Sequence, residues 1–286
     1  MADRVLIEPQ ELNDHLGDEN WLVFDCRHTL ADPDLGEEFY EEYHIPDARF
    51  AHLDRNLCSP VRPGSGRHPL PEESTFIAWL GSQGATPDHT IVVYDDTGGS
   101  FAGRLWWMLK YLLHHERVYV LNGGLEAWEQ ANLPTDGKVP MITPATYGRT
   151  FDRAKLVTLD QMKALYQEPG MVLVDARDGV RYRGEQEPLD PTPGHIPGAI
   201  NLPFMENMNG NWQFRPTPEL KTRYAKLAQV ADPENVIWYC GSGVTACHGM
   251  IAMVEAGYDP GRLYVGSWSE WCADPERPVE TQTNPS

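Results

Sequence analysis

Short apolar runs alternate with longer amphipathic stretches along the chain. Short apolar runs flanked by polar turns are typical of strands buried in a parallel sheet. Such runs occur at residues 21–24, 91–94, 118–121, 171–174, 236–239 and 263–265. Helical spacing predicts helices at residues 72–83, 103–113, 159–167, 218–229 and 244–255. Strands and helices in this alternation predict an α/β fold, with mostly parallel sheets flanked by helices.

The motifs of the first half of the chain recur in the second half. An Asp-x-Arg motif at 25–27 recurs at 175–177, and His-Ile-Pro at 44–46 recurs at 195–197. The apolar run that ends at Asp95 matches the run that ends at Cys240. Matching blocks in one order at nearly constant spacing indicate two copies of one domain. We therefore predict domains at 1–138 and 153–286, joined by a linker at 139–152 that lies within a stretch, 133–153, rich in Pro, Thr and Gly.

The net charge and the cysteine content exclude several classes of partner and cofactor. The 286 residues carry a formal net charge of −19, so the chain lacks the basic face that a nucleic acid or an anionic membrane would need. No apolar run approaches the roughly 20 residues of a membrane span, and no signal-peptide pattern opens the chain. The 5 cysteines include no Cys-x-x-Cys pair, which argues against a disulfide framework or a structural zinc site. We expect a cytoplasmic protein without a metal.

Cys240 is the residue that most strongly indicates a chemical function. It ends an apolar run and is followed by Gly241 and Gly243, just before the helix predicted from Val244. Glycines allow the amides from Gly241 through Thr245 to turn toward the sulfur, and the helix dipole adds positive potential. Both favour the nucleophilic thiolate. A buried, inert cysteine is the alternative, although two glycines so close to it favour a reactive one.

Together, these motifs resemble the tandem-domain rhodanese family, the thiosulfate and mercaptopyruvate sulfurtransferases. The resemblance rests on the duplicated Asp-x-Arg and His-Ile-Pro motifs, the Cys-Gly-Ser-Gly-Val-Thr loop at 240–245 and the Gly-Ser-Trp-Ser-Glu-Trp block at 266–271. It implies two tandem rhodanese-like domains and a persulfide on Cys240, with no cofactor. Asp95 replaces the cysteine in the first copy, and a carboxylate cannot accept sulfur. The first domain is therefore expected to be inactive and to line a pocket between the domains.

The residues after Cys240 favour 3-mercaptopyruvate as the sulfur donor. In the thiosulfate branch of the family an Arg or Lys follows the cysteine, whereas Gly241 follows here. Ser242 matches a serine that handles protons in the mercaptopyruvate branch. By the same resemblance, a histidine and an aspartate of the first domain would orient Ser242, and His44 and Asp34 are the candidates. Because His44 recurs as His195, a structural role for it stays open.

An arginine should bind the carboxylate of this donor. The resemblance points to Arg181, in a binding region that includes Asp175, and an ion pair of Arg181 with Asp175 is the structural alternative. A second arginine, common in the mercaptopyruvate branch just before Gly-His-Ile-Pro, is missing here. Arg183 is the candidate to replace it.

We therefore predict a sulfurtransferase that moves sulfane sulfur from 3-mercaptopyruvate to an acceptor. The acceptor would be a thiol, such as thioredoxin or a small thiol, or cyanide. Thiosulfate is the alternative donor, and a sulfur carrier or regulatory module is a further alternative. A phosphatase is not expected, because Ala246 stands where that chemistry needs an arginine.

Overall fold

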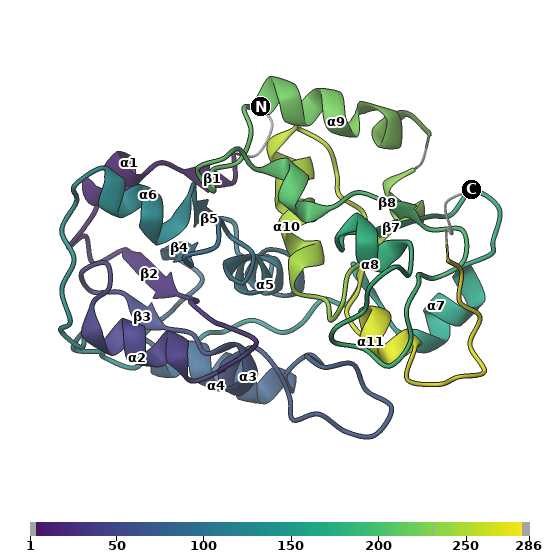
Figure 1. Cartoon of the computed structure of the whole chain (residues 1–286). Coiled ribbons are helices and arrows are strands. Elements are labelled where there is room, and N and C mark those ends of the chain that lie inside the picture. Colours follow the sequence, from purple (N-terminus) through teal and green to yellow (C-terminus); the bar gives the residue numbers. More distant parts are fainter. Residues whose placement is uncertain (1–3, 231, 282–286) are drawn as a thin grey trace.

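The two halves of the chain form two α/β units with the same strand order. The computed structural model describes residues 4–230 and 232–281 (Figure 1). The first sheet has the order β1-β5-β4-β2-β3 and the second the order β6-β10-β9-β7-β8, with every neighbouring pair parallel. The outer ends of the predicted domains, residues 1–3 and 282–286, lie outside the described residues. The α/β duplication predicted from the repeated motifs is confirmed.

The central strands lie where the apolar runs predicted them. The first sheet comprises β1 (Leu6–Ile7), β2 (Trp21–Asp25), β3 (Arg49–Phe50), β4 (Thr90–Tyr94) and β5 (Val118–Leu121). The second comprises β6 (Leu156–Val157), β7 (Val172–Asp175), β8 (Ile200–Asn201), β9 (Val236–Tyr239) and β10 (Arg262–Tyr264). The edge strands β1, β3, β6 and β8 were not predicted, because two residues are too few to show a period.

Helices pack on both faces of each sheet. The first half contains α1 (Pro9–Asn13), α2 (Leu35–Glu42), α3 (Leu53–Asn56), α4 (Glu73–Ser82), α5 (Ala102–Trp107), which continues as a π-helical turn at Met108–Leu112, and α6 (Gly124–Gln130). The second contains α7 (Leu159–Leu165), α8 (Gly179–Tyr182), α9 (Thr217–Val230), α10 (Thr245–Glu255) and α11 (Ser267–Trp271), with 3-10 turns at Phe204–Asn207 and Pro233–Asn235. No helix in the described part of the chain has the length and apolarity needed to cross a membrane.

Helices α5 and α10 join the two halves, side by side at the centre of the molecule (Figure 1). Gly103 on α5 approaches the α10 backbone so closely that a Cβ there would lie 3.3 Å from the His248 nitrogen. Each of these helices follows one of the matching loops, the first after Asp95 and the second after Cys240. Their contact therefore brings the two loops to one interface.

The predicted linker contains no helix or strand, yet it is packed against the first half. The amide of Ala145 donates to the Gly81 carbonyl at 2.8 Å. The ring of Tyr147 is buried, and its hydroxyl lies 2.6 Å from Nδ1 of His115. Residues 139–152 are thus held against the first sheet's helices along part of their length.

Candidate active site

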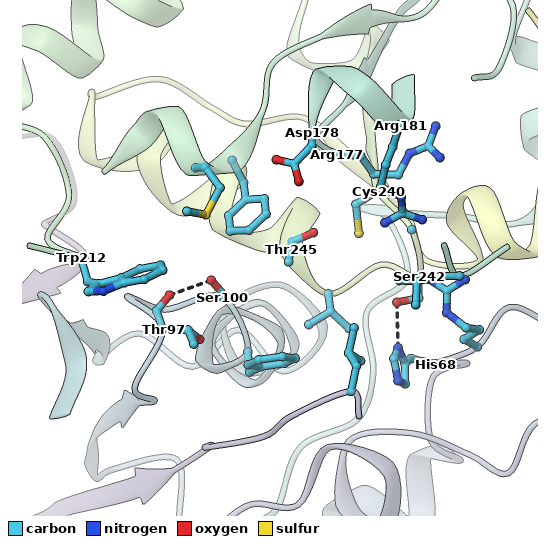
Figure 2. Close-up of a pocket in the computed structure, with 18 residues that line it drawn as sticks. His68, Thr97, Ser100, Arg177, Asp178, Arg181, Trp212, Cys240, Ser242 and Thr245 are labelled. Atoms are coloured by element: carbon cyan, nitrogen blue, oxygen red, sulfur yellow. Dashed lines mark hydrogen bonds between the residues drawn. The ribbon is translucent and has the colours of Figure 1, made fainter. Parts of the chain in front are cut away.

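A cavity of about 290 Å³ lies between the two halves, and Cys240 opens into it (Figure 2). The first half contributes residues of the loops around Arg67 and Thr97, and the second contributes the whole loop from Cys240 to Thr245 except Gly243. Most of the remaining wall is apolar, formed by Leu30, Phe101, Leu189, Phe204, Met205 and Trp212. The cavity is large enough for a small acid and is shared by both domains.

The sulfur of Cys240 lies at the end of β9, within reach of a backbone donor. The Gly243 amide donates to Cys240 Sγ at 3.2 Å. Gly243 has φ +75°, and a Cβ there would collide with the Val265 carbonyl, so only glycine fits. Among the described residues, the amides of Ser242, Val244 and Thr245 have no hydrogen-bond acceptor. These free donors, at the start of α10, offer a binding site for an anion beside the sulfur.

The turn before α11 holds the cysteine loop from behind. Ser267 Oγ accepts from the Cys240 amide at 3.1 Å, while Trp268 and Ser269 donate to the carbonyls of Cys240 and Gly241, each at 2.9 Å. Ser267 adopts φ +55°, an uncommon conformation for a serine. The Gly-Ser-Trp-Ser-Glu-Trp block therefore anchors the loop and fixes the position of the sulfur.

In the first half, the matching loop surrounds the carboxylate of its own Asp95. The Asp95 carboxylate accepts four backbone amides, those of Thr97, Gly99, Phe101 and Ala102, at 2.8–2.9 Å. Asp95 is fully buried. A strand-end loop of this kind thus directs its amides at one negatively charged group. This internal comparison supports the same capacity in the cysteine loop.

A serine, a histidine and an aspartate form a chain beside Cys240. Ser242 Oγ lies 2.7 Å from Nδ1 of His68 (Figure 2), and Nε2 of His68 lies 3.4 Å from Oδ1 of Asp54. Burial, with smaller contributions from Arg104 and Arg67, lowers the pKa of His68 to about 3. His68 is therefore neutral at pH 7. The Asp54 carboxylate favours the tautomer with the proton on Nε2, so Nδ1 accepts the Ser242 hydroxyl proton.

Arg104 connects the histidine to the cysteine loop. It lies on α5 and is fully buried. Its guanidinium donates to the carbonyls of Gly243 at 3.0 Å and His68 at 3.1 Å. Among the described residues no carboxylate forms an ion pair with it. A buried positive charge without a carboxylate partner is costly, and here it contributes positive potential next to the loop that carries the sulfur.

The structure places His44 and Asp34 away from Ser242, which corrects the expectation for both. His44 is buried, with Nδ1 2.6 Å from the Tyr40 carbonyl and Nε2 3.1 Å from the Lys138 carbonyl. Its counterpart His195 makes the same kind of contact, with Nδ1 2.6 Å from a carbonyl of α8. This histidine supports the fold of each domain. Asp34 is exposed and faces His52 at 3.4 Å.

Of the two arginines expected to bind substrate, Arg181 and Arg183, only the first lies at the cavity. Arg181 lines the cavity, but its ion pairs are with Glu187 and Asp190, and Asp175 is buried against Arg177 instead. Arg183 lies outside the cavity and pairs with a neighbouring surface carboxylate. Arg183 is therefore badly placed to replace the missing arginine. Asp175 is likewise badly placed to bind the substrate. Within the described residues no group of three or more His, Cys, Asp or Glu could hold a metal ion.

Comparison with known proteins identifies the family. The model of the rhodanese-like domain matches the chain twice, at residues 8–131 and 158–274. The chain belongs to the rhodanese family. It is 42% identical over 282 residues, 98% of this chain and 99% of the other, to a Pseudomonas aeruginosa protein named "Probable 3-mercaptopyruvate sulfurtransferase". It is 36% identical over 255 residues to the thiosulfate sulfurtransferase of Cricetulus griseus, covering 86% of this chain and 82% of that protein.

The fold agrees with solved rhodanese structures. The 3-mercaptopyruvate sulfurtransferase of Leishmania major superposes with a TM-score of 0.84 at 32% identity, covering 95% of this chain and 75% of that one. The prediction of two tandem rhodanese-like domains is confirmed, and so is the relationship to sulfurtransferases. Rhodanese relatives bearing both donor names match this chain, so the donor has to be argued from the site.

Proposed function

We propose that this rhodanese is a sulfurtransferase that takes sulfur from 3-mercaptopyruvate onto Cys240 and passes it to a thiol or to cyanide. One observation carries the proposal: the bond of 2.7 Å between Ser242 and the neutral His68, in the same cavity as Cys240. A proton-handling pair next to a nucleophile suits a donor whose leaving group must be protonated.

In the first half-reaction the Cys240 thiolate attacks the sulfur of 3-mercaptopyruvate. An S–S bond forms, the C–S bond breaks, and its electron pair leaves as the enolate of pyruvate. The proton that the substrate sulfur carried ends on the enolate carbon, so the products are a Cys240 persulfide anion and pyruvate. The Ser242 hydroxyl donates its own proton to His68 and presents a lone pair to the cavity. Through this lone pair, Ser242 can relay the proton from the substrate sulfur to the enolate carbon.

The persulfide is held by the loop that holds the cysteine. The amides without an acceptor, at Ser242, Val244 and Thr245, can bond the outer sulfur, as four amides bond Asp95 in the first half. In the second half-reaction an acceptor thiolate or cyanide attacks the outer sulfur. The Cys240 thiolate then leaves, and the free enzyme is restored.

Thiosulfate remains the second candidate donor, because three arginines, Arg67, Arg177 and Arg181, line the cavity. Its leaving group, sulfite, needs no proton. Thiosulfate therefore makes no use of the Ser242–His68 pair. The glycine after Cys240, where the thiosulfate branch carries a cation, also favours 3-mercaptopyruvate.

The test combines mass spectrometry with kinetics. Incubation with 3-mercaptopyruvate should add one sulfur atom to the parent, removable by cyanide, and none to Cys240→Ser. The kcat/KM for 3-mercaptopyruvate should exceed that for thiosulfate by at least about tenfold, or about 1.4 kcal/mol. Equal or reversed values would assign the protein to thiosulfate, and a stable adduct without turnover would indicate a sulfur carrier.

A further inference from the structure

The first domain has a cavity of its own, separate from the one at Cys240. Its volume is about 340 Å³, and among the described residues the two cavities share no lining residue. Arg27, just after β2, lines it together with side chains of α2, of α6 and of the loop after β4. The reaction proposed for Cys240 makes no use of this cavity, and the internal repeat shows what it lacks.

Arg27 in the first domain is equivalent to Arg177 in the second. Each arginine pairs with the aspartate two residues before it, and each donates from Nη2 to a main-chain carbonyl at 2.6 Å. Nη1 of Arg177 also lies 3.2 Å from Oε2 of Glu187. Among the described residues, Nη1 of Arg27 has no acceptor. The first domain thus keeps the arginine of this contact without the carboxylate.

A difference in chain length explains why the carboxylate is missing. The ring of Tyr40 stacks on His44 as the ring of Tyr182 stacks on His195, so these pairs mark equivalent positions. Three residues separate the first pair and twelve separate the second, and Glu187 lies within the longer segment. The short connection of the first domain borders the cavity. The cavity therefore lies where the longer segment brings its carboxylate to the arginine in the second domain.

The charges around the cavity restrict the ligand that could replace this carboxylate. The side chain of Arg27 is 2% exposed and its charge is balanced by Asp25, while Glu42, Glu126 and Glu129 also line the cavity. A simple anion at Nη1 would be repelled by the three glutamates. A simple cation would leave the buried guanidinium donor without an acceptor. A ligand that carries both a carboxylate and an ammonium group satisfies both sets of partners.

We propose that this cavity binds a free α-amino acid with an apolar side chain. The carboxylate of the ligand accepts from Nη1 of Arg27, in the place that Glu187 has in the second domain. Its ammonium group bonds the glutamates of α6, Glu126 and Glu129. Its side chain covers Phe39, which lines the cavity and is 39% exposed, unusually high for so large an apolar residue.

The test compares L-leucine with two analogues that each lack one of its charged groups. In 4-methylpentanoate the ammonium group is missing, and in isoamylamine the carboxylate is missing. In a ligand-observed NMR titration of the full chain, L-leucine should bind at least about 10-fold more tightly than either analogue, because each analogue leaves one charged partner unsatisfied. Failure of L-leucine to bind below about 10 mM, or binding no tighter than that of an analogue, would overturn the proposal.

Two double variants separate a site from a general effect of charge. Glu126→Gln/Glu129→Gln keeps the shape of the cavity but removes two negative charges. It should weaken L-leucine at least about 10-fold and tighten 4-methylpentanoate, which no longer meets the repulsion. Glu116→Gln/Glu168→Gln is the matched control, because it removes the same charge at exposed positions outside the cavity, and it should change neither value. Equal effects of the two double variants would refute a site at Arg27.

Arg27→Lys tests the other half of the site. Lysine keeps a positive charge for Asp25 but loses Nη1, so L-leucine should bind no better than isoamylamine does. An unchanged preference for L-leucine would overturn the role of Arg27. If this variant does not fold, the glutamate variant decides. None of these measurements depends on sulfur transfer at Cys240, so they stand or fall separately from the proposed function.

Discussion

Removing the Ser242 hydroxyl should separate the two candidate donors. The hydroxyl is buried in the loop that begins at Cys240, and its oxygen lies 2.7 Å from Nδ1 of His68. With 3-mercaptopyruvate, Ser242→Ala removes the group that relays the proton to the leaving enolate. General acid–base catalysis contributes about 10²- to 10⁴-fold. We take the lower value, because the neutral His68 has a pKa of about 3 and is a weak base.

The expected loss is therefore about 100-fold in kcat/KM for 3-mercaptopyruvate, or about 2.7 kcal/mol. Thiosulfate releases sulfite without a proton, so its kcat/KM should change by no more than about 3-fold. His68→Ala should show the same selectivity. The double variant should lose little more than either single variant, because both substitutions break one proton path and their effects are not additive.

Turnover of 3-mercaptopyruvate is measured by the release of pyruvate, and turnover of thiosulfate by the release of sulfite. His114→Ala serves as a control, because His114 is exposed and pairs with Asp152 at 2.8 Å, far in the chain from the serine loop. If Ser242→Ala lowered kcat/KM equally for both donors, the hydroxyl would be shaping the cysteine loop rather than moving a proton. If the two single losses simply added in the double variant, Ser242 and His68 would be acting independently. Either result would refute the proton relay.

Three other predictions test the loops and the buried histidines. Gly243→Ala should lower the rate of persulfide formation more than about 10-fold, measured by intact mass, because a Cβ at its φ of +75° collides with a carbonyl. Asp95→Ala should lower the free energy of unfolding in urea by roughly 3–5 kcal/mol, because four buried amides lose their acceptor; a loss below about 1 kcal/mol would mean that water replaces the carboxylate. Burial lowers the pKa of His68 and His248 to about 3 and that of His115 to about 4. The unfolded chain binds these protons below pH 6.5 and the folded chain does not, so stability is complete above pH 6.5 and should fall by up to about 4 kcal/mol per pH unit below it. His115→Gln should reduce that slope by about a third in thermal unfolding measured against pH, and an unchanged slope would contradict the assignment.

Local patterns were sufficient for the features that depend on neighbouring residues. The central strands are continuous apolar runs, because a strand covered on both faces buries every side chain. The repeat revealed two domains, and the presence of Asp95 where the matching loop has Cys240 predicts that the first domain is inactive. The cysteine loop could be predicted because its glycines, its strand end and its helix start are adjacent in the chain.

His44 shows where such reasoning is insufficient to choose between a catalytic and a structural role. Its His-Ile-Pro motif was conspicuous because it occurs in both halves, but a residue needed in both copies serves what the copies share, which is the fold. His68 has no counterpart in the second half, and this asymmetry was the only sign of its role in the sequence. It lies in the loop between α3 and α4, which has no periodic pattern.

The sequence by itself determined the fold of each domain, the duplication and the candidate nucleophile, because strand burial, motif recurrence and loop chemistry are encoded in adjacent residues. Only the tertiary structure decided which groups surround Cys240. Ser242 and His68, like Arg67 and Asp190, come from opposite domains and meet because α5 packs against α10. That meeting depends on how two helices fit together across an interface, and the spacing of residues along one chain carries no direct record of it.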